Sequence, residues 1–198
     1  MIAALVGYIV GSLPLGFLIT RGRRGIDLRR VGSGNVGAAN VYRSAGRSLG
    51  VLVMLVDVAK GAGGVLLARL VEGGSGEGIA LAGLGAVVGH VYPVWLRFVG
   101  GKGVAVACGV FALLAPLATV IAASVFVLTT WMTRYVSLGS VLAMLALPAV
   151  EWTREGPEPV TLAATAVSAL VLFRHRGNLA RILHGTERRL GQRAAVNS

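Results

Sequence analysis

Apolar residues are grouped along the chain in six long stretches separated by short polar segments. A helix crosses about 30 Å of hydrocarbon with roughly 20 residues, so each of the first three stretches is long enough for one crossing. The fourth stretch is half as long again and contains Pro116, which cannot continue a regular helix, so we expect two helices joined there. The stretches are 2–20, 49–71, 79–96, 104–133, 136–150 and 159–173.

Charge alternates between the polar segments. Basic residues dominate 21–47, 97–103, 134–135 and the tail after 173, whereas glutamates dominate 72–78 and 151–158. The positive-inside rule places the basic segments in the cytoplasm and the acidic ones outside. Both ends of the fourth stretch are then cytoplasmic, so that stretch must cross twice. The pattern predicts an all-α, polytopic integral membrane protein with seven transmembrane helices, an outside N-terminus and a cytoplasmic C-terminus.

Composition excludes the main alternatives to a membrane protein. Of 198 residues, 55% are hydrophobic and only 14% charged, too few charges to cover a soluble fold of this size. The composition also excludes a disordered chain, and one cysteine, Cys108, cannot form an internal disulfide. The arginines at 21–24 follow the first apolar stretch, whereas a signal peptide has them before it, so we expect a retained helix. We treat residues 1–198 as one transmembrane domain.

The net charge of +11 indicates an anionic partner, either lipid headgroups or an anionic substrate. The first candidate site is the glycine-rich segment 31–43. Its backbone N–H groups could turn toward an anion together with Gly34, Ser33 and Asn35, and Asn40 could cap the next helix. Arg43 ends the segment. A plain glycine-rich turn is the alternative.

The second candidate is the glycine-flanked Lys102, between Gly101 and Gly103 at a helix start. A lysine there suits a phosphate oxygen. The segment lacks the spacing of a Walker loop. Lys102 could instead extend to lipid phosphate.

Two pairs of polar residues lie at the predicted cytoplasmic edge. Ser137 and Ser140 are three residues apart at a helix start, and His175 and Asn178 have the same spacing. The segment 174–184 also has an apolar stripe, so an amphipathic helix on anionic lipid explains most of its pattern.

Asp57 and Lys60 lie deep in the second stretch, where ionisable side chains normally pair and face a protein cavity. A structural ion pair and a role in the site stay open, as they do for His90. The histidines and the cysteine show no metal-ligand spacing, and we expect no metal and no cofactor. Neither a serine-hydrolase motif nor a nucleic-acid-binding motif is present.

Six motifs in order resemble the acyl-phosphate:glycerol-3-phosphate acyltransferases, the PlsY family of bacterial inner-membrane enzymes. The resemblance covers essentially the whole chain. It departs at residue 39, where the family commonly has threonine and this chain has alanine, and at residue 106, where valine replaces threonine. The motifs are GSGNVGAAN (32–40), DVAKG (57–61), GHVYPV (89–94), GGKGVA (100–105), RYVSLGS (134–140) and HRGNLARILHGTE (175–187).

The resemblance implies transfer of a fatty acyl group from acyl phosphate to the 1-hydroxyl of glycerol 3-phosphate, giving lysophosphatidic acid and phosphate. It implies a bacterial inner-membrane location with the active site on the cytoplasmic side. Membrane lipid is a further partner, nucleic acid is not, and we expect a monomer. A transporter of organic phosphates and a lipid-binding scaffold are the competing classes.

We expect Lys102, Ser33 and the loop amides to hold the acyl phosphate. Arg43, Ser140, His175 and Asn178 would hold glycerol 3-phosphate, with Ser137 nearby. Lys102, His175 and Ser140 are the expected catalytic residues. The proton acceptor is either His175 or a phosphate oxygen of the substrate, and we favour the phosphate. The predicted substrate-binding set is Ser33, Gly34, Asn35, Asn40, Arg43, Lys60, Gly101, Lys102, Gly103, Ser137, Ser140, His175 and Asn178.

Overall fold

The computed structural model describes residues 1–72 and 76–192, and within them the chain is helical with no β-strand. Of the basic residues in the tail, Arg193 lies outside the described residues. The helices are α1 (Ile2–Ser12), α2 (Leu15–Arg24), α3 (Ala38–Ser44), α4 (Arg47–Glu72), α5 (Gly76–Val91), the 3-10 turn η1 (Val94–Leu96), α6 (Val104–Leu114), α7 (Pro116–Thr133), α8 (Val136–Arg154) and α9 (Pro159–Leu183).

The fourth apolar stretch breaks where the sequence predicts. Helix α6 ends at Leu114 and α7 begins at Pro116, with the non-helical residue Ala115 between them. Proline is well suited to this first helical position because its missing N–H needs no partner there. The expected pair of helices in this stretch is confirmed.

The first apolar stretch differs from the prediction of one helix over 2–20. Helix α1 ends at Ser12 and α2 begins at Leu15, because Pro14 interrupts the backbone ladder. Leu13 has extended backbone, and its carbonyl accepts a hydrogen bond from the Lys60 ammonium at 3.0 Å. The break therefore creates a polar backbone group inside the bundle.

Two further boundaries differ. The third stretch leaves the α-helix at Val91, and Pro93 starts a short turn before the loop 97–103. The segment 174–184 is not a separate surface helix, because α9 runs without interruption to Leu183 and buries His175 and Asn178. The side of this segment that carries His175 and Asn178 faces the interior of the helix bundle, so the segment does not lie flat on the lipid surface.

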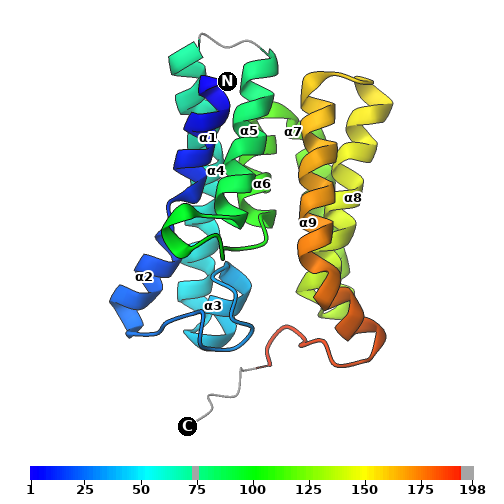
Figure 1. Cartoon of the computed structure of the whole chain (residues 1–198). Helices are drawn as coiled ribbons and strands as arrows, with labels where there is room; N and C mark the ends of the chain where they lie inside the picture. The colour runs from blue at the N-terminus through cyan, green and yellow to red at the C-terminus, as the bar shows by residue number, and fades with distance from the viewer. Residues whose placement is uncertain (73–75, 193–198) are drawn as a thin grey trace.

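Small residues allow α1 and α5 to pack closely. A Cβ atom on Gly7 or Gly11 would lie 2.0 Å from the carbonyl oxygen of Ala82 or Ala86, and Gly85 and Gly89 approach α1 in the same way. This is the packing that small residues at four-residue spacing produce in membranes. In Figure 1, α8 and α9 lie together beside the group formed by α1, α4, α5 and α6.

Five described segments are long and apolar enough to cross a membrane, and α6 is a shorter apolar helix. Large apolar side chains such as Leu55, Val120 and Trp131 are exposed on the outer surface, as lipid-facing positions require. The seven crossings predicted from the sequence add α6 and α9 to these five. The five segments are Ile2–Arg24, Arg47–Val71, Gly76–Leu96, Pro116–Thr133 and Val136–Arg154.

Candidate active site

One cavity of about 460 Å³ opens among α3, α4, α6, α7, α8 and α9, and His90 at the end of α5 also lines it. Its polar part lies at the end of the bundle that carries the segments 25–37, 97–103, 134–135 and 184–192, which we call the basic end (Figure 1). Its inner part is apolar and is lined by Cys108, Phe111, Ala122, Met144 and Leu147. The polar lining includes Ser33, Asn35, Asn40, Arg43, Lys102, Gly103, Ser137, Ser140, His175, Asn178 and Glu187.

The glycine-rich segment is held in shape by Asn40, which is 2% exposed. Its amide oxygen accepts the Ser33 backbone N–H at 3.0 Å, and its NH₂ group donates to the carbonyls of Val31 and Asn35. Asn40 lies inside α3, which begins at Ala38 with no side-chain cap, so the expected capping role is wrong. The amide is instead used to fold the loop that presents Ser33.

The second glycine-rich segment lies against the end of α5. The N–H groups of Gly100 and Gly101 donate to the carbonyls of Val91 and His90, each at 3.1 Å. The Asn35 side chain donates to Gly100 O at 3.3 Å, which ties the two glycine-rich segments together. Gly103 has a left-handed backbone with φ of +92° and starts α6, so the turn that presents Lys102 needs glycine there.

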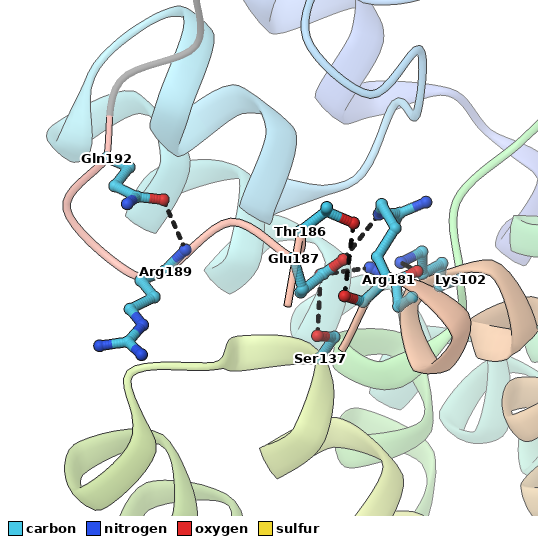
Figure 2. Close-up of polar contacts among 8 residues, drawn as sticks. Lys102, Ser137, Arg181, Thr186, Glu187, Arg189 and Gln192 are labelled. Atoms are coloured by element: carbon cyan, nitrogen blue, oxygen red, sulfur yellow. Dashed lines mark hydrogen bonds and ion pairs between the residues drawn. The ribbon is translucent and has the colours of Figure 1, made fainter. Parts of the chain in front are cut away.

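A chain of hydrogen bonds runs from Lys102 to the C-terminal segment (Figure 2). The Lys102 ammonium donates to the Asn178 amide oxygen, and the Asn178 NH₂ group donates to Glu187 Oε1 at 2.6 Å. Ser137 also donates to Oε1, at 2.8 Å, and Arg181 Nε donates to Oε2 at 2.7 Å. Asn178 is thereby oriented with its oxygen toward the lysine and its nitrogen toward the carboxylate.

His175 and Ser140 complete the polar lining. The Nδ1 atom of His175 lies 2.8 Å from the carbonyl of Val171, one turn earlier in α9. That carbonyl can only accept, so Nδ1 carries the proton and, in the neutral ring, Nε2 has the free lone pair. Ser140 is 4% exposed and donates to Val136 O at 2.9 Å.

Burial and neighbouring cations shape the charges of the site. Burial, together with the charges of Arg181, Arg43 and Arg174, lowers the pKa of Lys102 to about 8 against the opposing effect of Glu187. Burial also lowers the pKa of the Arg43 guanidinium, as does the charge of Arg188. The pKa of Glu187 is lowered because hydrogen bonds from Asn178, Ser137 and Arg181 outweigh its burial. The polar part of the cavity is thus strongly positive and suited to anions.

Arg43 has a donor free for a ligand. Its Nε atom is buried and, among the described residues, has no hydrogen-bond partner. Buried donors without a partner are costly, so a ligand that accepts this hydrogen bond would be favoured. Within the described residues no three metal-ligating side chains come together.

The sequence reasoning gave Glu187 no role. It is the only acidic residue after Glu158, in a strongly basic tail, and this contrast was the available signal. The segment that carries it is attached to the start of α8: Leu190 N–H donates to Arg134 O at 2.7 Å, and the Arg189 guanidinium lies 5.3 Å from the centre of the Tyr135 ring. The C-terminal segment therefore forms part of the cavity wall.

Three of the expected substrate-binding residues do not line this cavity. Gly34 forms a tight turn with φ of +70°, and Gly101 packs against the end of α5. Lys60 is not a lining residue, because its ammonium is held by Leu13 O and His90 Nδ1, although His90 itself lines the cavity. The remaining ten expected residues line it together.

The chain is similar to known proteins over nearly its whole length. The sequence profile of the family described as "Glycerol-3-phosphate acyltransferase" matches residues 1–185. A protein of that name from Syntrophotalea carbinolica is 45% identical, with 95% of this chain and 96% of the relative aligned. Another from Agrobacterium fabrum is 43% identical, with 97% and 92% aligned.

Two solved structures have the same fold. One is the glycerol 3-phosphate form of PlsY (YgiH), an integral membrane glycerol 3-phosphate acyltransferase, with a TM-score of 0.89 and 39% identity over 96% of this chain and 94% of that one. The other is the lysophosphatidic acid form, with a TM-score of 0.86, 37% identity and the same coverage.

Proposed function

The chain belongs to the glycerol-3-phosphate acyltransferase family, and from this membership we propose that its cavity transfers a fatty acyl group from acyl phosphate to the 1-hydroxyl of glycerol 3-phosphate. The products are lysophosphatidic acid and inorganic phosphate. The observation that carries the proposal is the continuity of a cationic part and an apolar part in one cavity. The phosphate of an acyl phosphate suits the cationic part, and its fatty chain suits the apolar part.

The cationic part supplies what two phosphate groups require. Lys102, Ser33 and the loop amides would hold the phosphate of the acyl donor, and Arg43 would hold glycerol 3-phosphate together with Asn178. A charged side chain at each phosphate is worth more in this buried setting than in water. The unpartnered Nε of Arg43 supports its assignment to the second phosphate.

The chemical step needs no covalent enzyme intermediate. The glycerol hydroxyl oxygen attacks the acyl carbonyl carbon, the new C–O bond forms, and the bond between that carbon and the phosphate oxygen breaks. Phosphate is a good leaving group, so positioning and charge stabilisation supply most of the rate increase. Lys102 offsets the charge that grows on the departing phosphate.

The proton of the attacking hydroxyl passes to an oxygen of the departing phosphate. His175 has an Nε2 lone pair that would orient the hydroxyl, since its Nδ1 proton is held by Val171 O. Imidazolium formation there would add a positive charge near Lys102 and Arg174, which disfavours His175 as the final acceptor. Ser140 and Ser137 lie on the same face of α8 and would contact the glycerol hydroxyls.

The membrane arrangement follows the charge pattern. We propose seven crossings with the basic end in the cytoplasm of a bacterial cell, in the inner membrane, because both substrates and the basic segments then meet on one side. All the side chains that line the cavity come from one chain, so a monomeric single domain suffices.

The test is a purified, reconstituted chain supplied with labelled glycerol 3-phosphate and palmitoyl phosphate. We expect labelled lysophosphatidic acid and one equivalent of phosphate, with no product when a palmitoyl thioester replaces the acyl phosphate. A failure to form product overturns the proposal, and uptake of label into vesicles under the same conditions would identify a transporter instead.

A further inference from the structure

A second charged cluster adjoins the cavity inside the bundle, and two of its three members, Asp57 and His90, belong to the cavity lining. It consists of Asp57 and Lys60 on α4 and His90 on α5, whose side chains are 4%, 3% and 8% exposed. The Lys60 ammonium lies 3.1 Å from His90 Nδ1, 3.0 Å from Leu13 O and 3.4 Å from Asp57 Oδ1. Burying these charges is expensive, and the proposed chemistry uses none of them directly.

The proton inventory of the cluster determines the state of His90. An ammonium has three donors and no acceptor, so Lys60 uses one donor on each of its three neighbours. His90 Nδ1 must then accept, which leaves the ring proton on Nε2. The distance from Nδ1 to Asp57 Oδ1 is 3.6 Å, too long for a hydrogen bond between them.

The Nε2 edge of His90 lies against the loop that presents Lys102. A Cβ atom on Gly101 would lie 2.0 Å from Nε2, so the ring touches the Gly101 backbone. The backbone carbonyl of His90 also accepts a hydrogen bond from the Gly101 N–H, at 3.1 Å. His90 therefore contacts this glycine from two directions, one residue before Lys102.

We infer that Asp57, Lys60 and His90 form a positioning cluster for Lys102. Lys60 orients the His90 ring, the ring braces Gly101, and the braced loop keeps the Lys102 ammonium at Asn178 and the cavity. Asp57 balances the charge of Lys60. The inference rests on the proposed function, because it assigns the cluster a role in placing the lysine that holds the acyl phosphate.

The test removes the charges of Asp57 and Lys60 and measures whether the resulting loss of kcat/KM depends on Lys102. The variant Asp57→Asn/Lys60→Met loses both charges together, so it leaves no unpaired ion in the bundle. Two full-length variants are compared: one has this pair of substitutions alone, and the other has the pair together with Lys102→Met. The matched control is Arg69→Met, another cation-to-methionine change on α4, whose guanidinium donates to Leu113 O at 3.5 Å.

We expect the paired variant to lower kcat/KM for acyl phosphate about tenfold in the wild-type background and less than twofold in the Lys102→Met background, because residues that act through one another are not additive. A tenfold fall in both backgrounds, or in neither, overturns the inference. An inactive wild-type chain would instead overturn the proposed function.

Nitrogen NMR of His90 gives a readout independent of activity. In the wild-type chain we expect Nδ1 to be the unprotonated nitrogen and Nε2 the protonated one, and we expect the paired variant to show a mixture of tautomers. A wild-type His90 with its proton on Nδ1 contradicts the proposed orientation by Lys60.

Discussion

Lys60 is buried and Lys102 is half-buried, both next to the same cavity, yet their surroundings differ. Lys60 has three neighbours for its three donors: Asp57 on its own helix, His90 on α5 and Leu13 in the break between α1 and α2. Its side chain is 3% exposed. Lys102 donates to Asn178 and faces the cavity with its remaining donors. The Lys60 ammonium is therefore bound entirely by protein groups, whereas the Lys102 ammonium has donors available to a ligand.

The counter-charges differ in the same way. Asp57 lies on the same helix as Lys60 and contacts it directly, whereas Glu187 influences Lys102 through Asn178 while also pairing with Arg181. Lys102 therefore sits among several cations that share one carboxylate. The comparison teaches that burial alone does not identify a functional lysine; the count of donors left free does.

The largest expected effect comes from the available charge. Lys102→Met should lower kcat/KM about 10³-fold, because it removes a buried cation aimed at a leaving group, while Asp57→Asn/Lys60→Met should lower it about tenfold. Steady-state kinetics with acyl phosphate measures both, and Arg69→Met should stay within twofold of wild type. A Lys102→Met variant with more than a tenth of normal activity would remove the distinction between the two lysines.

The next effect is a pH dependence that belongs to Lys102. Its pKa of about 8 means that the ammonium is charged below that pH and loses its proton above it. Phosphate monoesters lose their second proton near pH ~6, so the charge of the substrate stays nearly constant above pH 7. We expect kcat/KM to fall about tenfold from pH 7 to pH 9.

The variant Lys102→Arg tests whether Lys102 causes the fall in kcat/KM at alkaline pH, because an arginine stays charged from pH 7 to pH 9. Its activity should be lower than that of wild type, with the alkaline fall absent. An unchanged alkaline limb in this variant would assign the titration to another group.

The smallest effect is on thermal stability. Inorganic phosphate at ten times its Kd should stabilise the wild-type chain by about 1.4 kcal/mol, a rise in Tm of about 3 °C at this chain length. The Asp57→Asn/Lys60→Met variant should keep most of that rise and Lys102→Met should lose most of it. Equal rises in both variants would contradict the view that, of the two lysines, only Lys102 has donors free for phosphate.

The sequence predicts the fold where composition and proline act locally. Charge and the position of Pro116 indicate the two helices α6 and α7. The break at Pro14 was missed because 19 apolar residues have the length of one crossing, and length outweighed the proline. The end of α5 before Pro93 was missed for the same reason.

The candidate site was predictable as a set of residues at one end of the bundle, since topology brings the ends of alternate helices together. Two side chains show the limit of that reasoning. A three-residue spacing places Lys60 beside Asp57 but does not say which neighbouring helix the ammonium faces. Glu187 was read as part of a basic tail, because its three donors come from α8 and α9 and meet only after folding.

The gap between α1 and α2 has a consequence for how residues in this chain are judged. Leu13 presents a half-exposed apolar side chain to the outside, and any similar residue would serve there. Its main-chain oxygen, released from the helix by the proline that follows, is one of the three atoms that hold Lys60. An inventory of side chains would pass over position 13, although the polypeptide backbone at that point is a working part of the molecule.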